Sequence, residues 1–220
     1  MRADRSGGRP SPGERHSAEK KRIVDVATAL ISEQGLDNFR IDTLCERLGY
    51  SRQNVYRYFQ GKQAILDAVV VDGCRTMAEA IAGQQSALDE PFDEQIIDGI
   101  LLACDFLRGG RQLNSYSGAN LSSGVRLFMA NAEPVQEVLL EFLRPLFDTA
   151  KQRGELYLNM SYTDITRWIF QVAVYQLIDA DYESREARRH FLLTMLSPAI
   201  NAKKARANAT IDSVHHTHVR

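Results

Sequence analysis

The spacing of apolar residues constrains the fold of this chain more than any other feature. Between residues 17 and 200, apolar side chains recur three and four positions apart, which is the period of an amphipathic helix. The sequence has no alternating run of β-branched residues of the kind that marks a strand. The pattern therefore predicts an all-α protein in which each helix buries one face.

The composition divides the chain into four segments. Residues 1–16 are rich in Gly, Pro, Ser and Arg, which predicts a disordered basic arm, with a first helix running from an N-cap at Ser17 to the stop at Gly35. We expect residues 17–62 to form one helical domain and residues 63–200 to form a second. Residues 201–220 predict a disordered tail, in which His215, His216 and His218 are more simply solvated side chains than metal ligands.

The remaining helices are expected between polar or glycine-containing breaks. We place them at residues 41–48, 51–59, 62–83, 91–108, 125–130, 132–153, 161–179 and 184–197. The stretch 109–124 is dominated by Gly, Ser and Asn and predicts a loop.

Charge is unevenly distributed along the chain. Residues 1–62 carry 12 Lys and Arg against 8 Asp and Glu, a balance of +4, whereas the remainder carries 15 against 20, a balance of -5. A net charge of -1 thus conceals a basic front segment, which is where a polyanion such as DNA would bind.

Other features limit the class of protein. The three cysteines, Cys45, Cys74 and Cys104, lie about thirty residues apart without a C-x-x-C pair, which favours reduced buried thiols over disulfides or zinc, while a redox role stays open. No stretch reaches the roughly 18 apolar residues of a membrane span, and no apolar region follows the basic start. We therefore expect a cytoplasmic protein without a membrane partner.

The segment 36–62 predicts a helix-turn-helix. Two short helices meet at Gly49, a turn geometry that presents the second helix to the major groove of DNA. Val55 and Phe59 face inward in that second helix. Its exposed face then offers side chains that can form paired hydrogen bonds with base edges, namely Arg52, Gln53 and Asn54.

These residues give the segment a specific resemblance. The 28 residues GLDNFRIDTLCERLGYSRQNVYRYFQGK, numbers 35–62, resemble the DNA-binding signature of the TetR family of bacterial transcriptional regulators. The positions that fall in register are Gly35, Phe39, Leu44, Gly49, Ser51, Tyr56, Tyr58, Phe59 and Lys62.

The resemblance implies how DNA is held. Phosphate contacts fall on Arg40, Ser51, Tyr56, Arg57 and Lys62. The chain departs from the family at Arg40, where a Thr or Ser usually caps the following helix. An arginine cannot cap in that way, so Arg40 is expected to contribute a charged contact instead.

The resemblance also implies that residues 63–200 bind a small effector and form a homodimer through the last two helices. A two-fold interface is expected at Ile165, Trp168, Ile169, Val172, Gln176, Phe191, Leu192, Met195 and Leu196. An effector pocket for a mostly apolar ligand with one polar or anionic end is expected at Leu102, Phe106, Tyr116, Arg126, Phe128, Met129, Phe170 and Tyr175. Every apolar residue in both sets is also compatible with an ordinary core.

The sequence therefore predicts a sequence-specific regulator that binds palindromic double-stranded operator DNA, uses no cofactor, and represses transcription until an effector releases it. The alternative is a nucleoid-associated or architectural protein that uses the same motif without effector control. An enzyme is disfavoured because the chain has no G-x-S-x-G, phosphate-binding glycine loop or H-E-x-x-H motif.

Overall fold

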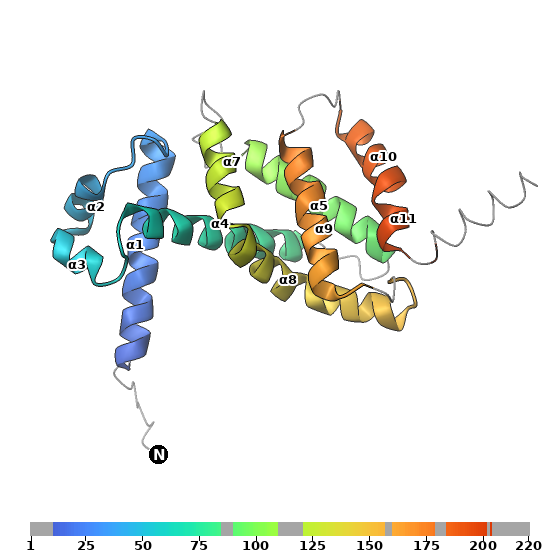
Figure 1. Ribbon diagram of the computed structural model, residues 1–220, viewed down its shortest axis with the longest axis horizontal. Helices are drawn as coiled ribbons and strands as arrows, with labels where there is room; N and C mark the ends of the chain where they lie inside the picture. Colours follow the sequence, from blue (N-terminus) through green and yellow to red (C-terminus); the bar gives the residue numbers. More distant parts are fainter. Residues whose placement is uncertain are drawn as a thin grey trace, which may run out of the picture. The chain divides into compact units, whose positions relative to one another are not determined.

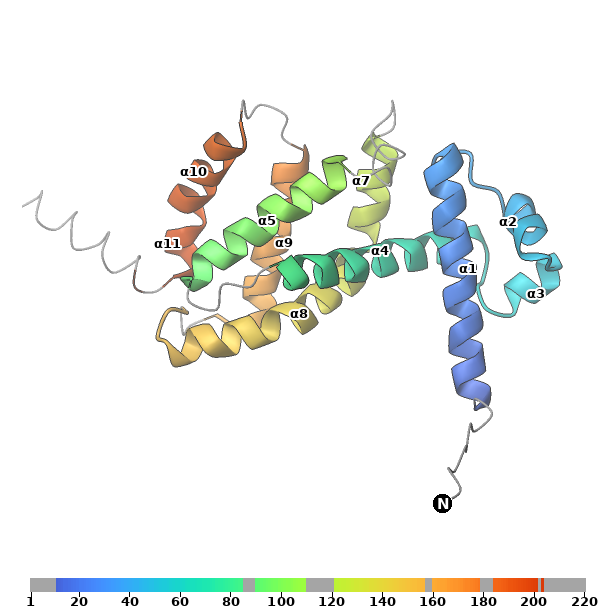
Figure 2. The same cartoon turned by 180° about the vertical axis from the view of Figure 1, so that it is seen from behind.

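The computed structural model describes residues 11–84, 90–109, 121–156, 160–178, 184–201 and 203. In these ranges the regular structure is helical, as the sequence predicts, and a single bridge pairs Leu156 with Asn201. The helices (Figures 1 and 2) are α1 (Pro12–Gln34), α2 (Ile41–Leu48), α3 (Arg52–Tyr56), α4 (Lys62–Gln84), α5 (Phe92–Gly109), α7 (Leu121–Ala130), α8 (Ala132–Gln152), α9 (Tyr162–Ile178), α10 (Arg185–Met195) and α11 (Ser197–Ile200). None of the described helices combines the length and hydrophobicity that crossing a bilayer requires.

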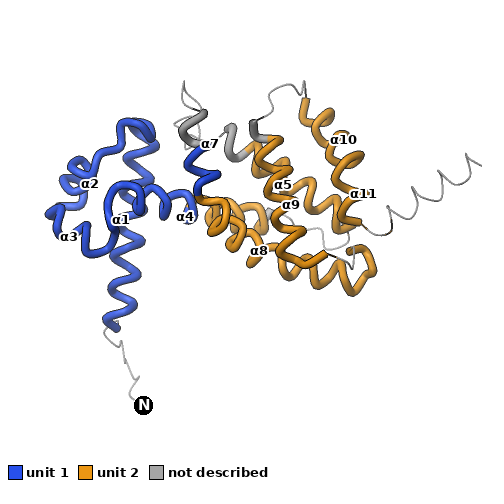
Figure 3. The backbone as a smooth tube through the Cα atoms, in the orientation of Figure 1, with its two compact units in different colours: residues 1–72, 111–130 blue, residues 73–110, 131–220 orange. Residues whose placement is uncertain are grey.

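The chain forms two compact units (Figure 3). Unit 1 comprises residues 1–72 and 111–130, and unit 2 comprises residues 73–110 and 131–220. Helix α4 contributes residues to both units, since the division falls between Asp72 and Gly73.

Unit 1 contains a small helical core built from α1, α2, α3 and the start of α4. Helix α1 packs against α2, and α2 packs against α3. Buried aromatic and aliphatic side chains from successive elements close this core, among them Ile23, Phe39, Leu44, Val55 and Ile65, each 0% exposed. The burial of Val55 fixes which side of α3 faces inward.

Helix α1 begins at Pro12, five residues before the predicted start at Ser17. Ser11 is the N-cap: its hydroxyl accepts a bond from the backbone N–H of Glu14, and the Glu14 carboxylate accepts one from the Ser11 N–H at 2.6 Å. Pro12 suits the first helical position because its fixed φ matches a helix and its missing N–H is not needed there. Residues 12–16 therefore belong to a helix, and the expected disordered arm is wrong for that part.

The turn between α2 and α3 depends on Gly49. Its φ of 69° lies in the left-handed region, and its N–H caps α2 by donating to Cys45 and Glu46 carbonyls. Ser51 then caps α3 by accepting a bond from the Asn54 N–H at 3.2 Å. Helix α3 ends at Tyr56 rather than at 59, although the N–H of Phe59 still bonds the Val55 carbonyl at 3.1 Å, which continues the turn.

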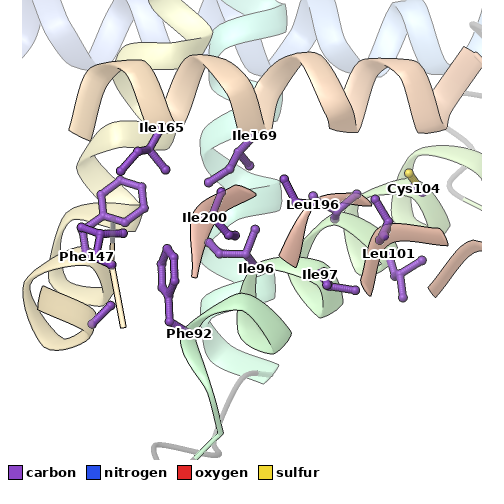
Figure 4. Packing of buried hydrophobic residues seen from close by; sticks show 14 residues of the cluster. Phe92, Ile96, Ile97, Leu101, Cys104, Phe147, Ile165, Ile169, Leu196 and Ile200 are labelled. Atoms are coloured by element: carbon purple, nitrogen blue, oxygen red, sulfur yellow. The ribbon is translucent and has the colours of Figure 1, made fainter. Parts of the chain in front are cut away.

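Unit 2 is organised around α5, which packs against α8, α9, α10 and α11. Figure 4 shows how side chains from these helices converge on it. Phe92 of α5 meets Phe147 of α8 in an edge-to-face contact with ring centroids 5.7 Å apart. Ile165 and Ile169 of α9 and Leu196 complete the same cluster.

A polar group also lies within unit 2. Asp93, the second residue of α5, is 0% exposed and accepts hydrogen bonds from the Ser197 hydroxyl and from the Asn201 amide, the latter at 2.6 Å. Asn201 is itself buried, so the beginning of the expected C-terminal tail belongs to the core. The three C-terminal histidines lie outside the described residues.

The three cysteines are free and buried, as the sequence predicts. Burial raises the pKa of the Cys74 thiol to about 11. Its thiolate is therefore scarce at neutral pH, which argues against a redox sensor at this position.

Candidate nucleic-acid interface

The polar face of α3 is open to solvent. Ser51, Arg52, Gln53 and Arg57 are exposed, and Asn54 is half-buried. Val55 and Phe59, the two positions expected to face inward, are buried. Two of the three residues expected to read bases are thus exposed and the third is half-buried, on a helix anchored by its apolar side.

The residues expected to contact phosphates also lie at the surface. Tyr56 is 46% exposed, which is the largest exposed fraction of any Phe, Tyr or Trp in the described part of unit 1. Arg40 is exposed and lies just before α2 without making a side-chain cap, as its chemistry predicts. Lys62 opens α4, and its ammonium lies 5.8 Å from the centre of the Phe39 ring.

Polar contacts tie α1 to the helix-turn-helix. The Tyr50 hydroxyl donates to the Glu19 carboxylate at 2.5 Å and accepts a bond from Arg22 at 2.8 Å. The bond to Glu19 raises the pKa of Tyr50, so the phenol keeps its proton. The guanidinium of Arg47 in α2 donates two hydrogen bonds, of 2.7 and 2.9 Å, to the carboxylate of Glu33 in α1. These contacts join α1 to α2 and to Tyr50 at the surface, outside the buried core that packs the helices together.

One contact was not expected from the sequence. Asp42, the second residue of α2, accepts two hydrogen bonds from Arg52, the first residue of α3, each 2.6 Å long. The ten-residue separation has no helical periodicity, so only the fold of the turn brings the two side chains together. The available signal is an acid in the first turn of the helix that precedes Arg52, the arginine expected to read bases.

Comparison with known proteins agrees with this geometry. Residues 23–69 match the family model described as bacterial regulatory proteins of the tetR family. The class C tetracycline repressor protein of Escherichia coli is 28% identical over 171 residues, which cover 76% of this chain and 70% of that protein. Residues 23–69 therefore carry the DNA-binding segment of the tetR family, and the chain is similar to a TetR-type repressor over most of its length.

Solved structures, one of them described as a TetR-family repressor, share the fold over most of their length. RolR without ligand superposes with a TM-score of 0.64 at 18% identity, covering 80% of this chain and 89% of that one. The repressor QsdR of R. erythropolis gives a TM-score of 0.60 at 16% identity, covering 81% and 94%. At this identity the likeness concerns the fold, and the family match over residues 23–69 identifies a TetR-like DNA-binding helix-turn-helix in the N-terminal part of the chain.

The expected TetR-type dimer residues fall into two groups. Five are buried within unit 2 itself and contribute to its interior: Ile165, Ile169, Gln176, Leu192 and Leu196. Such side chains have little surface left to offer a partner. Of the other four, Val172 and Phe191 are half-buried, whereas Trp168 and Met195 expose 41% and 61% of their surfaces.

The expected pocket residues are spread over both units. Phe170 is buried and Leu102 half-buried in unit 2, where Tyr175 is 56% exposed. In unit 1, Phe128 is half-buried, whereas Arg126 and Met129 are exposed. Tyr116 and the side chain of Phe106 lie outside the described residues. A side chain as open as Tyr175 does not line a closed cavity within its own unit, so Tyr175 is the weakest member of the set.

Proposed function

We propose that this TetR-family chain is a homodimeric repressor that binds a palindromic operator and is released from it by a small effector. The observation that carries the proposal is the open polar face of α3, held on a buried apolar face. Such a helix fits the major groove of B-DNA, where each base pair presents a distinct pattern of donors and acceptors.

Roles are divided between two sets of side chains in this proposal. Arg52, Gln53 and Asn54 read base edges, because guanidinium and amide groups can form paired hydrogen bonds there. Phosphates are contacted by Arg40, Ser51, Tyr56, Arg57 and Lys62. The Ser51 oxygen accepts the capping bond from Asn54, which leaves its hydroxyl proton available to a phosphate oxygen.

Dimerisation through unit 2 has support in exposed apolar surface. Trp168 and Tyr175 lie seven residues apart on α9, which brings them to the same face of the helix, and both are open to solvent. Met195 at the end of α10 is open as well. Apolar side chains that share an exposed helix face support an interaction surface, and two copies of the α9 face would provide the self-complementary contact of a two-fold dimer.

Effector control has support in related structures and in α4. RolR has been solved with resorcinol, and the regulator FadR of Bacillus subtilis with stearoyl-CoA. For this chain we propose a mostly apolar ligand with one polar or anionic end, held by residues of the expected pocket other than Tyr175. Helix α4 begins at the phosphate-contacting Lys62 and has residues in both units, so a shift along it can couple the two events.

The coupling needed is modest. To weaken operator binding 100-fold, the effector must favour the DNA-incompetent state by about 2.7 kcal/mol. Tight effector binding that leaves operator affinity unchanged would contradict this part of the proposal.

The proposal is tested by selecting duplexes from a random pool with the purified full-length chain. Asn54→Ala is expected to lose about 1–3 kcal/mol of discrimination at one base position per half-site. Lys62→Ala should weaken binding to every duplex alike. Lys151→Ala removes an equal charge from an exposed position in unit 2 and is the matched control. It should change neither the base discrimination nor the overall affinity for DNA. Identical behaviour of the Asn54 and Lys62 variants would contradict the assignment of roles.

An architectural protein would behave differently in the same assay. Both kinds of protein lose affinity as salt rises, with a slope of about -5 if the dimer neutralises about six phosphates. A regulator should prefer its operator over unrelated duplexes by about three powers of ten or more. An absence of preference would favour the architectural alternative.

A further inference from the structure

The guanidinium of Arg52 is already held on one side before DNA arrives. Its Nε donates to Oδ1 of Asp42 and its Nη2 donates to Oδ2, both at 2.6 Å. Both side chains remain open, with 61% of Arg52 and 57% of Asp42 exposed. The pair therefore lies in solvent and joins the first turn of α2 to the first residue of α3, the helix proposed to meet DNA.

This pairing leaves a defined edge of the guanidinium available. Arginine carries five N–H donors in a flat fork. Asp42 takes the edge formed by Nε and one hydrogen of Nη2, so the outer edge, with a hydrogen on each of Nη1 and Nη2, is not used by these two bonds. Two parallel donors match the two neighbouring acceptors of guanine, O6 and N7, and no other base presents two acceptors side by side in the major groove.

We propose that Asp42 is a positioning residue that fixes Arg52 for a guanine, so that each operator half-site carries guanine at the base read by Arg52. The inference rests on the proposed function and deepens it by naming one base and the residue that enforces it. Holding a long side chain in place before binding removes part of the entropy cost of ordering it on DNA. The same carboxylate repels phosphates, so it discourages binding that does not include the guanine.

The opposite role for Asp42 is masking, in which the carboxylate competes with DNA for Arg52. The two roles differ in what the loss of Asp42 does to base preference. Without a positioning residue, Arg52 becomes a mobile cation that any base or phosphate can attract, and preference falls. Without a mask, operator affinity rises and preference is kept.

The experiment uses the full-length chain and the duplex that it selects from a random pool. The base position read by Arg52 is the one whose preference disappears in Arg52→Ala. At that position the wild type should favour guanine by about tenfold to hundredfold over each other base, and 7-deazaguanine, which lacks N7, should lose most of this preference. Asp42→Asn should reduce the preference to about threefold or less while leaving the other positions unchanged.

Two controls separate positioning from general effects. Glu46→Gln removes the same charge from the exposed part of the same helix and should keep the guanine preference. In an Arg52→Ala background, Asp42→Asn should change no base preference, because nothing is left to position. Asp42→Asn should also bind a random duplex at least as tightly as the wild type, which shows that the variant is folded.

The outcomes that overturn the inference differ from those that overturn the proposed function. A wild type that selects a clear sequence in which the Arg52 position is not guanine refutes the inference alone. The same holds if Asp42→Asn keeps its guanine preference, with or without a gain in operator affinity. A wild type that selects no sequence refutes the proposed function itself.

Discussion

Two aspartates occupy the same place in two helices, one in each unit, and their surroundings are opposite. Asp42 is the second residue of α2 and its side chain is 57% exposed, beside the exposed cation of Arg52. Asp93 is the second residue of α5 and is 0% exposed, and its hydrogen-bond partners include the neutral side chains of Ser197 and Asn201. The N-terminal turn of a helix favours an acid in both cases, so local preference does not separate them.

The two sites differ in whether water reaches the carboxylate. At Asp42 water screens the charges and competes for every hydrogen bond, so the pair adds little to stability but is free to meet another molecule. At Asp93 water is excluded, so each bond is expensive to lose and none is available to a partner. The comparison teaches that an exposed ion pair near a turn is a candidate for recognition, whereas a buried carboxylate that is hydrogen-bonded inside the core belongs to the architecture.

The largest effect is expected from Asp93→Ala. The change leaves the Ser197 hydroxyl and the Asn201 amide buried without the carboxylate they bind, and it should lower the free energy of unfolding of unit 2 by about 3 kcal/mol. Trp168, the only tryptophan of the chain, lies in unit 2, so its fluorescence during urea unfolding reports on this unit.

The matched control is Asp105→Ala, which removes an exposed acid from the same helix and breaks only its surface pair with Arg185. Its urea midpoint should stay close to that of the wild type. If Asp93→Ala and Asp105→Ala lower the free energy of unfolding equally, the buried hydrogen bonds of Asp93 stabilise unit 2 no more than a surface ion pair does. The comparison between the two aspartates then fails.

A smaller effect is expected from Gly49→Ala in unit 1. The φ of Gly49 is 69°, and nothing lies within 4 Å of the added methyl group, so the cost is backbone strain alone. A loss of about 1–2 kcal/mol follows. It should appear as faster amide hydrogen exchange across residues 41–56.

Gly73→Ala supplies the control for the glycine variant. Gly73 lies inside α4 with ordinary helical φ and equally open space around its Cα. Alanine should therefore be neutral or stabilising there, by up to about 1 kcal/mol. Equal losses at the two glycines would show that the left-handed turn is not what makes Gly49 necessary.

The next effect in size is expected from Ser51→Ala, which removes the cap of α3 and should cost unit 1 about 1 kcal/mol. Ser51→Asp keeps a capping oxygen and should retain stability, measured by the same hydrogen exchange. Its added negative charge should nevertheless weaken operator binding if Ser51 meets a phosphate. Undiminished DNA affinity in Ser51→Asp would remove Ser51 from the phosphate set.

Much of the fold was predictable because helical periodicity and caps are local. The bounds of α2 and the caps at Gly49 and Ser51 agree with the sequence pattern. The start of α1 was not recognised, because Pro12 and Gly13 resemble the disordered composition before them. The Ser11–Glu14 capping box outweighs that composition, and Pro12 favours a helix start rather than opposing it.

The sequence predicted the candidate site only where the exposure of a side chain follows from its position on one helix. Exposure on α3 follows from the inward spacing of Val55 and Phe59, so its polar face was visible in the sequence. The contact between Asp42 and Arg52 depends on the angle at which two helices meet, which no periodicity encodes. The same limit applies to α9, where Ile165 lies in the core and Trp168 at the surface. Apolar residues occur in protein cores and in interfaces, so their sequence positions alone do not separate the two.

The smallest effect on stability is expected from Asp42→Asn, which tests the other half of the comparison. Because both members of the Asp42–Arg52 pair are more than half exposed, the urea midpoint of the variant should match that of the wild type within the error of the measurement. A double-mutant cycle with Arg52→Ala should likewise show no resolvable coupling at 1 M salt, where exposed charges are screened over about 3 Å. A clear loss of stability that survives high salt would mean that Asp42 holds the turn together, as Asp93 holds α5 to the C-terminal residues of unit 2. Stability unchanged with altered base preference would instead separate recognition from architecture at residue 42.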